Sequence, residues 1–305
     1  MRIADRSGRV PARDCRAQAS CSNFRVGLIC LSLLDGSKPA IESAAVCNAT
    51  GLTPAPWGLA YRPATVDDIP CVMRPREEGG QLHHKGQVEV ISSLERDGRA
   101  IPHDIRFGVW VVFEGETEYI RRCFAEYGVK TDPSGRYACL YKRWHLIGLE
   151  VGISVASVGL RGEPTGCATR FGADAVATAK RDLNAGELLD GEGGYTVVGR
   201  LMPAADSLAR GCLPLGLAQG CKLLCAVAAG EPIGWGDVAL DGTSSAVALR
   251  REMEARARRD GLNLLSAPRG AAGRPRAARV GRAASAGRVR GHARALRAPG
   301  PPGRA

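Results

Sequence analysis

The chain has 305 residues, of which 45% are apolar, and this length can form one or two globular cores. Its formal charge of +11 comes from the ends, because residues 261–305 contain ten Arg and no acidic residue and residues 1–25 add six Arg against two Asp. The body, residues 26–260, carries a net charge of −3, so the folded part is not the basic surface of a nucleic-acid-binding domain.

The first elements in chain order are an apolar segment and a helix. Residues 26–34 form the longest apolar run, which is shorter than the roughly 18 residues that span a bilayer and is typical of a buried strand. The segment 37–51 predicts a helix, with Ser37 as its N-cap, Pro39 in its first turn and Gly51 at its end.

Two strands and a second helix follow along the chain. The segments 87–93 and 108–114 predict strands, and 117–127 predicts an amphipathic helix. A long apolar stretch covers 144–160. Gly, Pro and Thr cluster at 161–173, where we place a domain boundary.

The segment 174–241 contains one sequence motif twice. Residues 180–190 and 224–233 each combine a β-prone run, the sequence Ala-Gly-Glu and an apolar pair. Each copy predicts a strand, a tight turn at the glycine and a returning strand. This duplication resembles the SAF domain, a small β-clip module with pseudo-repeated hairpins.

The eleven cysteines are dispersed, without a Cys-x-x-Cys motif. The nearest pair, Cys221 and Cys225, lies within one strand-like run, whereas a tetrahedral zinc site needs closely spaced thiolates. We therefore expect no metal site, buried thiols in a reducing compartment and a cytoplasmic location.

Basic and titratable residues gather in three places of the first half: the loop 74–80, the segment 83–86 and the segment 141–145. Arg and Lys pair with phosphate or carboxylate and His can transfer protons, so these segments favour an anionic substrate. Solvated loops whose ions pair with each other remain the alternative.

Taken in order, these segments resemble the oxidoreductases similar to deoxyxylulose-phosphate reductoisomerase, also labelled homoserine dehydrogenase-like or SAF-domain oxidoreductases. The matching stretches are 35–52, 74–80, 84–86, 90–96, 117–124, 145–150 and 154–157. The resemblance covers about residues 34 to 256 and implies an α+β fold. Its parts are a partial α/β catalytic domain at 34–165, a β-clip (SAF) module at 174–241 and a C-terminal helix at 242–256.

The two ends fall outside this resemblance. Residues 1–33 match poorly and are expected not to be native to the family. Residues 257–305 are expected to form a disordered tail rich in Arg, Ala, Gly and Pro. A basic arm that binds nucleic acid remains the alternative for this tail, although it has no aromatic residue for base stacking.

The resemblance also implies site residues. The segment 36–48 is similar to a stretch of reductoisomerases in which a Ser and an Asn hold the substrate from a helix. By position, Ser43 and Asn48 are substrate-binding residues, with Lys38 near them. We also expect Arg74, Arg143 and His145 of the basic segments to bind substrate, and Lys38, Glu42, His84 and Lys85 to be catalytic. The Lys and the metal-ligating Glu that follow the Asn in that stretch are Ala49 and Leu52 here, so a divalent metal is not expected.

Family members carry a Rossmann domain for NADP(H), which the resemblance implies as the cofactor. No Gly-x-Gly-x-x-Gly follows a strand in this sequence, so we assign no cofactor-binding residue and expect a truncated enzyme that is inactive alone. Its implied substrate is a small phosphorylated or hydroxylated, anionic or sugar-like molecule, with a homo-oligomer left open and no membrane or nucleic-acid partner. The alternatives are a remnant whose SAF module binds carbohydrate or protein, and a nucleic-acid binder with a basic tail.

Overall fold

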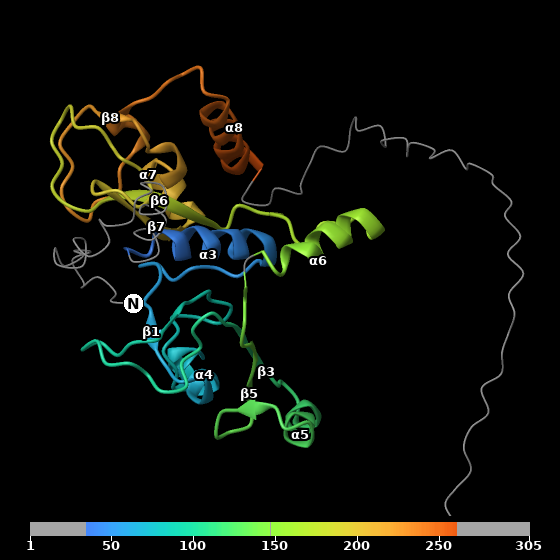
Figure 1. Ribbon diagram of the computed structural model, residues 1–305. Helices are drawn as coiled ribbons and strands as arrows, with labels where there is room; N and C mark the ends of the chain where they lie inside the picture. Colours follow the sequence, from blue (N-terminus) through green and yellow to red (C-terminus); the bar gives the residue numbers. More distant parts are fainter. Residues whose placement is uncertain (1–34, 147, 261–305) are drawn as a thin grey trace, which may run out of the picture. The chain divides into compact units, whose positions relative to one another are not determined.

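The computed structural model describes residues 35–146 and 148–260, which form helices and four small sheets (Figure 1). This mixed architecture confirms the α+β class. The strand expected at 26–34 lies outside the described residues, as does the tail from residue 261 onward. Within the described part, no helix is both long and apolar enough to cross a membrane.

The first half contains one long helix and a three-stranded sheet. Its elements are α3 (Ser37–Thr50), β1 (Arg62–Pro63), α4 (Ile69–Val72), β2 (Ile91–Ser92), β3 (Val109–Glu114), α5 (Glu118–Glu126), β4 (Lys130–Thr131), β5 (Tyr137–Lys142) and α6 (Val151–Ala156). Strands β1 and β2 pair in parallel. The antiparallel sheet has the order β3-β5-β4.

The second half is built on an antiparallel hairpin. Its elements are β6 (Ala173–Ala179), β7 (Val197–Pro203), α7 (Ala204–Arg210), β8 (Lys222–Leu223), β9 (Val238–Ala239) and α8 (Ser245–Asp260). Strand β6 pairs with β7 over its whole length, and β8 pairs with β9. A cluster of buried side chains in this half includes Leu183, Leu189, Leu213, Ile233 and Trp235.

Helix α3 lies against the β6–β7 hairpin, because its small side chains let the helix approach the strands closely. Ala40, Ala44 and Cys47 are buried against Ala173 and Leu201. The helix covers nearly the segment expected from the sequence, and it ends at Gly51 as expected.

The N-cap assigned to Ser37 is wrong. The cap is Gly36, which has a φ of 89°, and Ser37 is the first residue of the helix. The Ser37 side chain is buried and its Oγ accepts a hydrogen bond from the backbone N–H of Gly199 in β7 at 2.8 Å. Gly36 is required because a Cβ there would come within 2.5 Å of the Tyr61 hydroxyl.

The strand expected at 87–93 is mostly wrong, since only Ile91–Ser92 is a strand and Gln87 makes an isolated bridge. The alternating pattern arises because Gln87 and Glu89 are buried polar residues. Their side chains accept hydrogen bonds from backbone N–H groups of neighbouring loops, which a strand would have used in a ladder.

Two other elements agree with the sequence. Strand β3 covers all but one residue of the expected strand, and α5 lies within the expected helix. Thr117 caps α5, with its side chain accepting a hydrogen bond from the N–H of Ile120.

The duplicated motif of the sequence pairs with itself. Leu183 and Val227 exchange both backbone hydrogen bonds, at 2.9 and 3.0 Å. Gly186 donates to Leu223 and Gly230 donates to Ala179, each at 2.8 Å. Residues in equivalent positions differ by 44 in number throughout this pattern, so the two copies are related by an approximate two-fold rotation.

The two turn glycines provide a test of this symmetry. Gly186 and Gly230 both have a φ of 87°, in the left-handed region that strains any residue with a Cβ. Gly186→Ala and Gly230→Ala should therefore each lower the free energy of unfolding by about 1 kcal/mol. Urea denaturation measures this, with Gly236→Ala as the control because that glycine has open space and no positive φ. A cost at only one of the two turns would contradict the symmetry.

Candidate functional site

The segment that leads into α3 is held by a buried ion pair. The Asp35 carboxylate accepts a hydrogen bond from the N–H of Ser37 at 2.8 Å and pairs with Lys180 at 2.6 Å. The side chains are 3% and 13% exposed, and Lys180 also donates to the carbonyl of Gly194. This pair fixes the start of α3 to the second half of the chain.

Tyr61 holds the same segment from another side. Its hydroxyl donates to the carbonyl of Gly36 at 3.3 Å, and its N–H donates to the Glu89 carboxylate at 3.2 Å. Burial, together with the charges of Glu89 and Asp35, raises the pKa of Tyr61, so the hydroxyl stays a neutral donor. Tyr61 adopts a φ of 51°, a strained conformation that the bond to Glu89 helps to maintain.

Glu89 is itself a buried carboxyl. Burial raises its pKa, and hydrogen bonds from the N–H groups of Val90, Ala60 and Tyr61 act in the opposite direction. The group therefore serves as an acceptor that organises the loop around Tyr61.

Lys38 and Glu42 lie one turn apart on α3 and form an ion pair. Their side chains are 28% and 55% exposed, so both can be reached by a small molecule. A helical pair of this kind contributes only about 0.5 kcal/mol, which a charged ligand can replace. The structure thus brings together two of the four expected catalytic residues.

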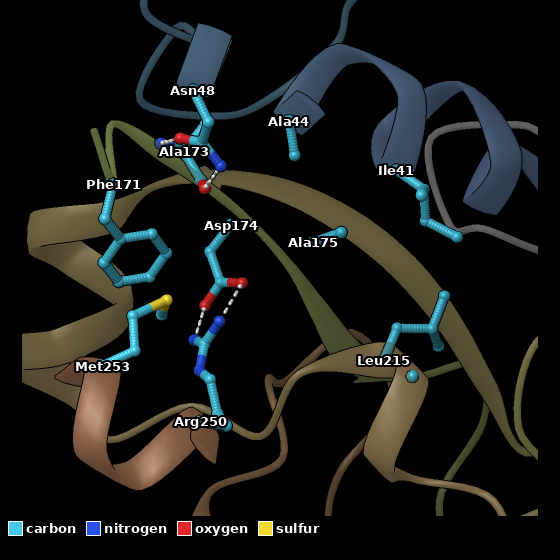
Figure 2. Close-up of a pocket in the computed structure, with 11 residues that line it drawn as sticks. Ile41, Ala44, Asn48, Phe171, Ala173, Asp174, Ala175, Leu215, Arg250 and Met253 are labelled. Atoms are coloured by element: carbon cyan, nitrogen blue, oxygen red, sulfur yellow. Dashed lines mark hydrogen bonds and ion pairs between the residues drawn. The ribbon is translucent and has the colours of Figure 1, made fainter. Parts of the chain in front are cut away.

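The two polar residues expected to bind substrate from α3 are engaged elsewhere or buried. Ser43 is buried. The Asn48 carbonyl oxygen accepts hydrogen bonds from the N–H groups of Gly172 and Ala173, at 2.7 and 3.0 Å, and its amide donates to the carbonyl of Ala173 at 3.1 Å (Figure 2). Asn48 therefore joins the end of α3 to the start of β6.

A pocket of about 290 Å³ lies beside Asn48. Arg250 of α8 binds Asp174 of β6 through both terminal nitrogens, and its guanidinium lies 4.8 Å from the centre of the Phe171 ring (Figure 2). The hydroxyl of Ser207 also donates to Asp174. Since these charges satisfy each other, the pocket offers mainly its apolar walls: Ile41, Ala44, Phe171, Ala173, Ala175, Leu215 and Met253.

His84 lies near the C-terminal end of α3. Its Nε2 is 3.4 Å from the Thr53 hydroxyl, and the N–H of Thr53 donates to the carbonyl of Gly86 at 3.0 Å. Lys38 is at the opposite end of the helix, roughly 18 Å away at 1.5 Å per residue. No hydrogen bond in the described part of the chain joins the two places.

Lys85 belongs to a separate ion network. It binds Glu114 at 2.5 Å, and Glu114 also binds Arg136, which pairs with Glu78 at 2.8 Å. Hydrogen bonds from Lys85 and then Arg136 hold the pKa of Glu114 below its ordinary value. The Lys85 side chain remains 64% exposed, so it is accessible although paired.

Arg74 compensates a buried charge. It lies 2.5 Å from Asp132, whose side chain is fully buried. Burial alone raises the pKa of Asp132, but hydrogen bonds from Tyr137 and Ser134 and the charge of Arg74 together lower it below its ordinary value. Arg74 is therefore bound to a protein carboxylate.

The last two expected residues lie at the end of β5. The Arg143 guanidinium is 5.0 Å from the ring centre of Trp144, and His145 Nδ1 is 2.5 Å from Glu150. The side chain of His145 is about half exposed. These residues form a further location, distinct in its contacts from the start of α3.

Sequence reasoning did not assign the residues that organise the start of α3. They are Asp35, Tyr61, Glu89 and Lys180. The signal for Asp35 was its place in the segment 35–52, directly before Gly36. Lys180 is 145 positions away, and only the fold reveals its pairing.

Residues 5–151 match the family model described as oxidoreductase DRL, catalytic domain, which supports an oxidoreductase family for the chain. The matched range includes the elements α3 to β5. It also includes most of the segment 1–33, which we expected not to be native to the family. No curated protein matches the chain. Within residues 35–146 and 148–260, no three His, Cys, Asp or Glu side chains cluster as a metal site would require.

The role of Asn48 can be tested through stability. Asn48→Ala removes three hydrogen bonds to backbone groups, and we expect it to lower the free energy of unfolding by about 2–3 kcal/mol. Asn48→Asp keeps the two accepted bonds and should cost less. Urea denaturation of both variants measures this difference. If Asn48→Ala were as stable as the unmodified chain, the structural role of Asn48 would be contradicted and substrate binding would be the better explanation for this residue.

The ionisation of Asp132 should make the free energy of unfolding depend on pH in the acid range. The pKa of Asp132 in the folded protein lies below its ordinary value of 3.8. The contribution of Asp132 to the free energy of unfolding is therefore fully present above pH 3.8 and is lost as the pH falls through the folded pKa. Asp132→Asn should cost about 2 kcal/mol at pH 7, and the difference from the unmodified chain should narrow below pH 3.8. Urea unfolding at several pH values measures this. Asp206→Asn, which changes an exposed carboxylate of α7, is the control. A pH-independent difference for Asp132→Asn would contradict the prediction.

Proposed function

We propose that the chain is the catalytic portion of an NADP-dependent, reductoisomerase-like oxidoreductase that acts on a small phosphorylated or hydroxylated substrate. The observation that carries this proposal is the match of residues 5–151 to the catalytic domain of oxidoreductase DRL. The resemblance of the segments 35–52 and 74–80 supports the finer assignment.

The start of α3 is the place where such a substrate would bind. Lys38 carries a positive charge on an accessible side chain, and the backbone beside it is fixed by Asp35 and Tyr61. A substrate phosphate or carbonyl oxygen would replace Glu42 as the partner of Lys38, which stabilises negative charge on that oxygen. Glu42 would then be free to accept a proton from a neighbouring hydroxyl.

The described residues contain no Gly-rich turn between a strand and a helix of the kind that holds a dinucleotide. They do not fit NADP(H), and we assign the cofactor no residue in the described part of the chain.

The duplicated module is proposed to be an SAF β-clip, which its reciprocal hydrogen bonds support. A second candidate function is binding of carbohydrate or protein by this module alone. Three side chains favour it, because Leu188, Tyr195 and Leu224 are 63%, 63% and 59% exposed. Substitution of Lys38 would leave such binding unchanged, which separates the two candidates.

The substrate site is tested by calorimetry with a phosphorylated ketose such as deoxyxylulose phosphate. Lys38→Ala should weaken binding about 10- to 100-fold, which corresponds to the loss of one hydrogen bond to a charged group. Arg99→Ala is the matched control, because Arg99 is an exposed base paired with Asp97. Equal affinity of Lys38→Ala and the unmodified chain would remove the start of α3 from the proposal.

A further inference from the structure

The pocket beside Asn48 is formed by parts of the chain that are distant in sequence. Its apolar side chains come from α3 (Ile41 and Ala44), Phe171, β6 (Ala173 and Ala175), the 3₁₀ turn Leu215–Leu217 (Leu215) and α8 (Met253). Figure 2 shows Phe171 and Met253 on one side of the Asp174–Arg250 pair and Ile41 and Leu215 on the other. The pocket therefore exists only in the folded chain, where these elements meet.

The walls of the pocket are fixed by the cores on which they rest. Phe171 is 2% exposed and packs with Ala204 and Ala257. Leu215 is 1% exposed and belongs to the buried cluster that contains Ile233. Side chains packed in this way keep their rotamers, so the pocket is largely formed before a ligand binds.

The size of the pocket limits what it can hold. Its volume is about 290 Å³, whereas an apolar cavity of roughly 150 Å³ lined by Leu, Ile and Phe binds benzene. On this scale the pocket takes a molecule of about twice the size of benzene, with roughly ten carbon atoms.

The charges in the pocket wall exclude an ionised ligand. Asp174 and Arg250 line the pocket, bind each other through two hydrogen bonds and are 6% and 14% exposed at their side chains. Their charges sum to zero. An ionised ligand would have to separate them, which leaves an uncompensated charge in a buried place. The charge balance therefore favours a neutral ligand.

The polar groups that remain available in the wall are donors. A guanidinium has five N–H groups, and Arg250 directs one to Glu254, at 2.8 Å, and two to Asp174. Among residues 35–146 and 148–260, the other two N–H groups of Arg250 have no hydrogen-bonded acceptor. The Asn48 amide likewise uses one of its two N–H groups, in the bond to Ala173. A ligand that offers an oxygen acceptor complements these donors.

We propose that this pocket binds a neutral, mainly apolar molecule of roughly ten carbon atoms that carries one carbonyl oxygen. Its apolar body packs between Phe171 and Leu215, and its carbonyl accepts a hydrogen bond from Arg250. Lys38 does not line the pocket, so this site is separate from the proposed substrate site and does not depend on the proposed function.

Three bicyclic probes of one shape test the chemical class. Calorimetry of the full chain with 1-indanone should show saturable binding with a Kd of about 0.1–1 mM. Indane has no oxygen and indane-1-carboxylate is an anion, so both should bind at least about 10-fold more weakly. Absence of saturable 1-indanone binding, equal binding of indane, or tighter binding of the carboxylate overturns the proposal.

The position of the bound probe is tested by nuclear magnetic resonance of methionine methyl groups. The chain has four Met, of which Met253 lines the pocket and Met73 lies in a separate cluster with Ile69 and Leu82. Addition of 1-indanone should shift the Met253 methyl signal, which Met253→Leu identifies, and leave the Met73 signal in place. A shift at Met73 without one at Met253 overturns the proposal.

A side chain added inside the pocket gives a further test. Gly216 lines the pocket, and a Cβ there would meet open space without a positive φ. Gly216→Leu should therefore fill part of the pocket and weaken 1-indanone binding about 10-fold or more. Gly236→Leu is the matched control, because Gly236 has open space in another 3₁₀ turn, Trp235–Asp237, and does not line the pocket.

Circular dichroism checks that both glycine variants are folded. A loss of affinity for Gly216→Leu alone supports the proposal. Unchanged affinity in a folded Gly216→Leu variant, or equal losses in both variants, overturns it.

Discussion

The attachment of α3 to the β6–β7 hairpin is the constraint on which the rest of the structure depends. At one end Asp35 and Ser37 bind Lys180 and Gly199, and at the other end Asn48 binds the backbone that opens β6. Between these ends the helix contacts the strands only through small side chains. Polar bonds at the ends fix the register of the helix, because small apolar side chains alone allow it to slide or rotate.

The Asp35–Lys180 pair illustrates why position matters more here than stability. A buried ion pair recovers little net free energy, since both groups lose hydration. Its value lies in geometry, because one oxygen of Asp35 binds Lys180 and the other binds the N–H that starts α3. The Lys38 side chain therefore projects from a backbone segment that is held in place by residues distant in sequence. We propose that this is how the second half of the chain contributes to substrate binding.

The sequence predicted the elements whose signal is local. Strand β3 and helix α5 follow from apolar periodicity and from the cap at Thr117, and the paired turns follow from the repeated Ala-Gly-Glu. Prediction failed at residues 87–90, where polar and apolar residues alternate as they do in a strand although the polar residues, such as Glu89, are buried. The alternation does not show which groups these polar side chains bind. The same reason explains Ser37, whose partner Gly199 is 162 residues away.

The expected site residues divide according to their partners. Lys38 and Glu42 meet because they are one helical turn apart, a spacing that the sequence contains. Arg74 and Lys85 each have a carboxylate from another segment, which no spacing reveals, whereas His145 pairs with Glu150 five residues further on. An exposed ion pair exchanges its partner for a ligand at little cost, whereas the removal of Arg74 from the buried Asp132 leaves an uncompensated charge. This difference in the cost of opening each pair makes Lys38 a better candidate than Arg74 for an anionic substrate.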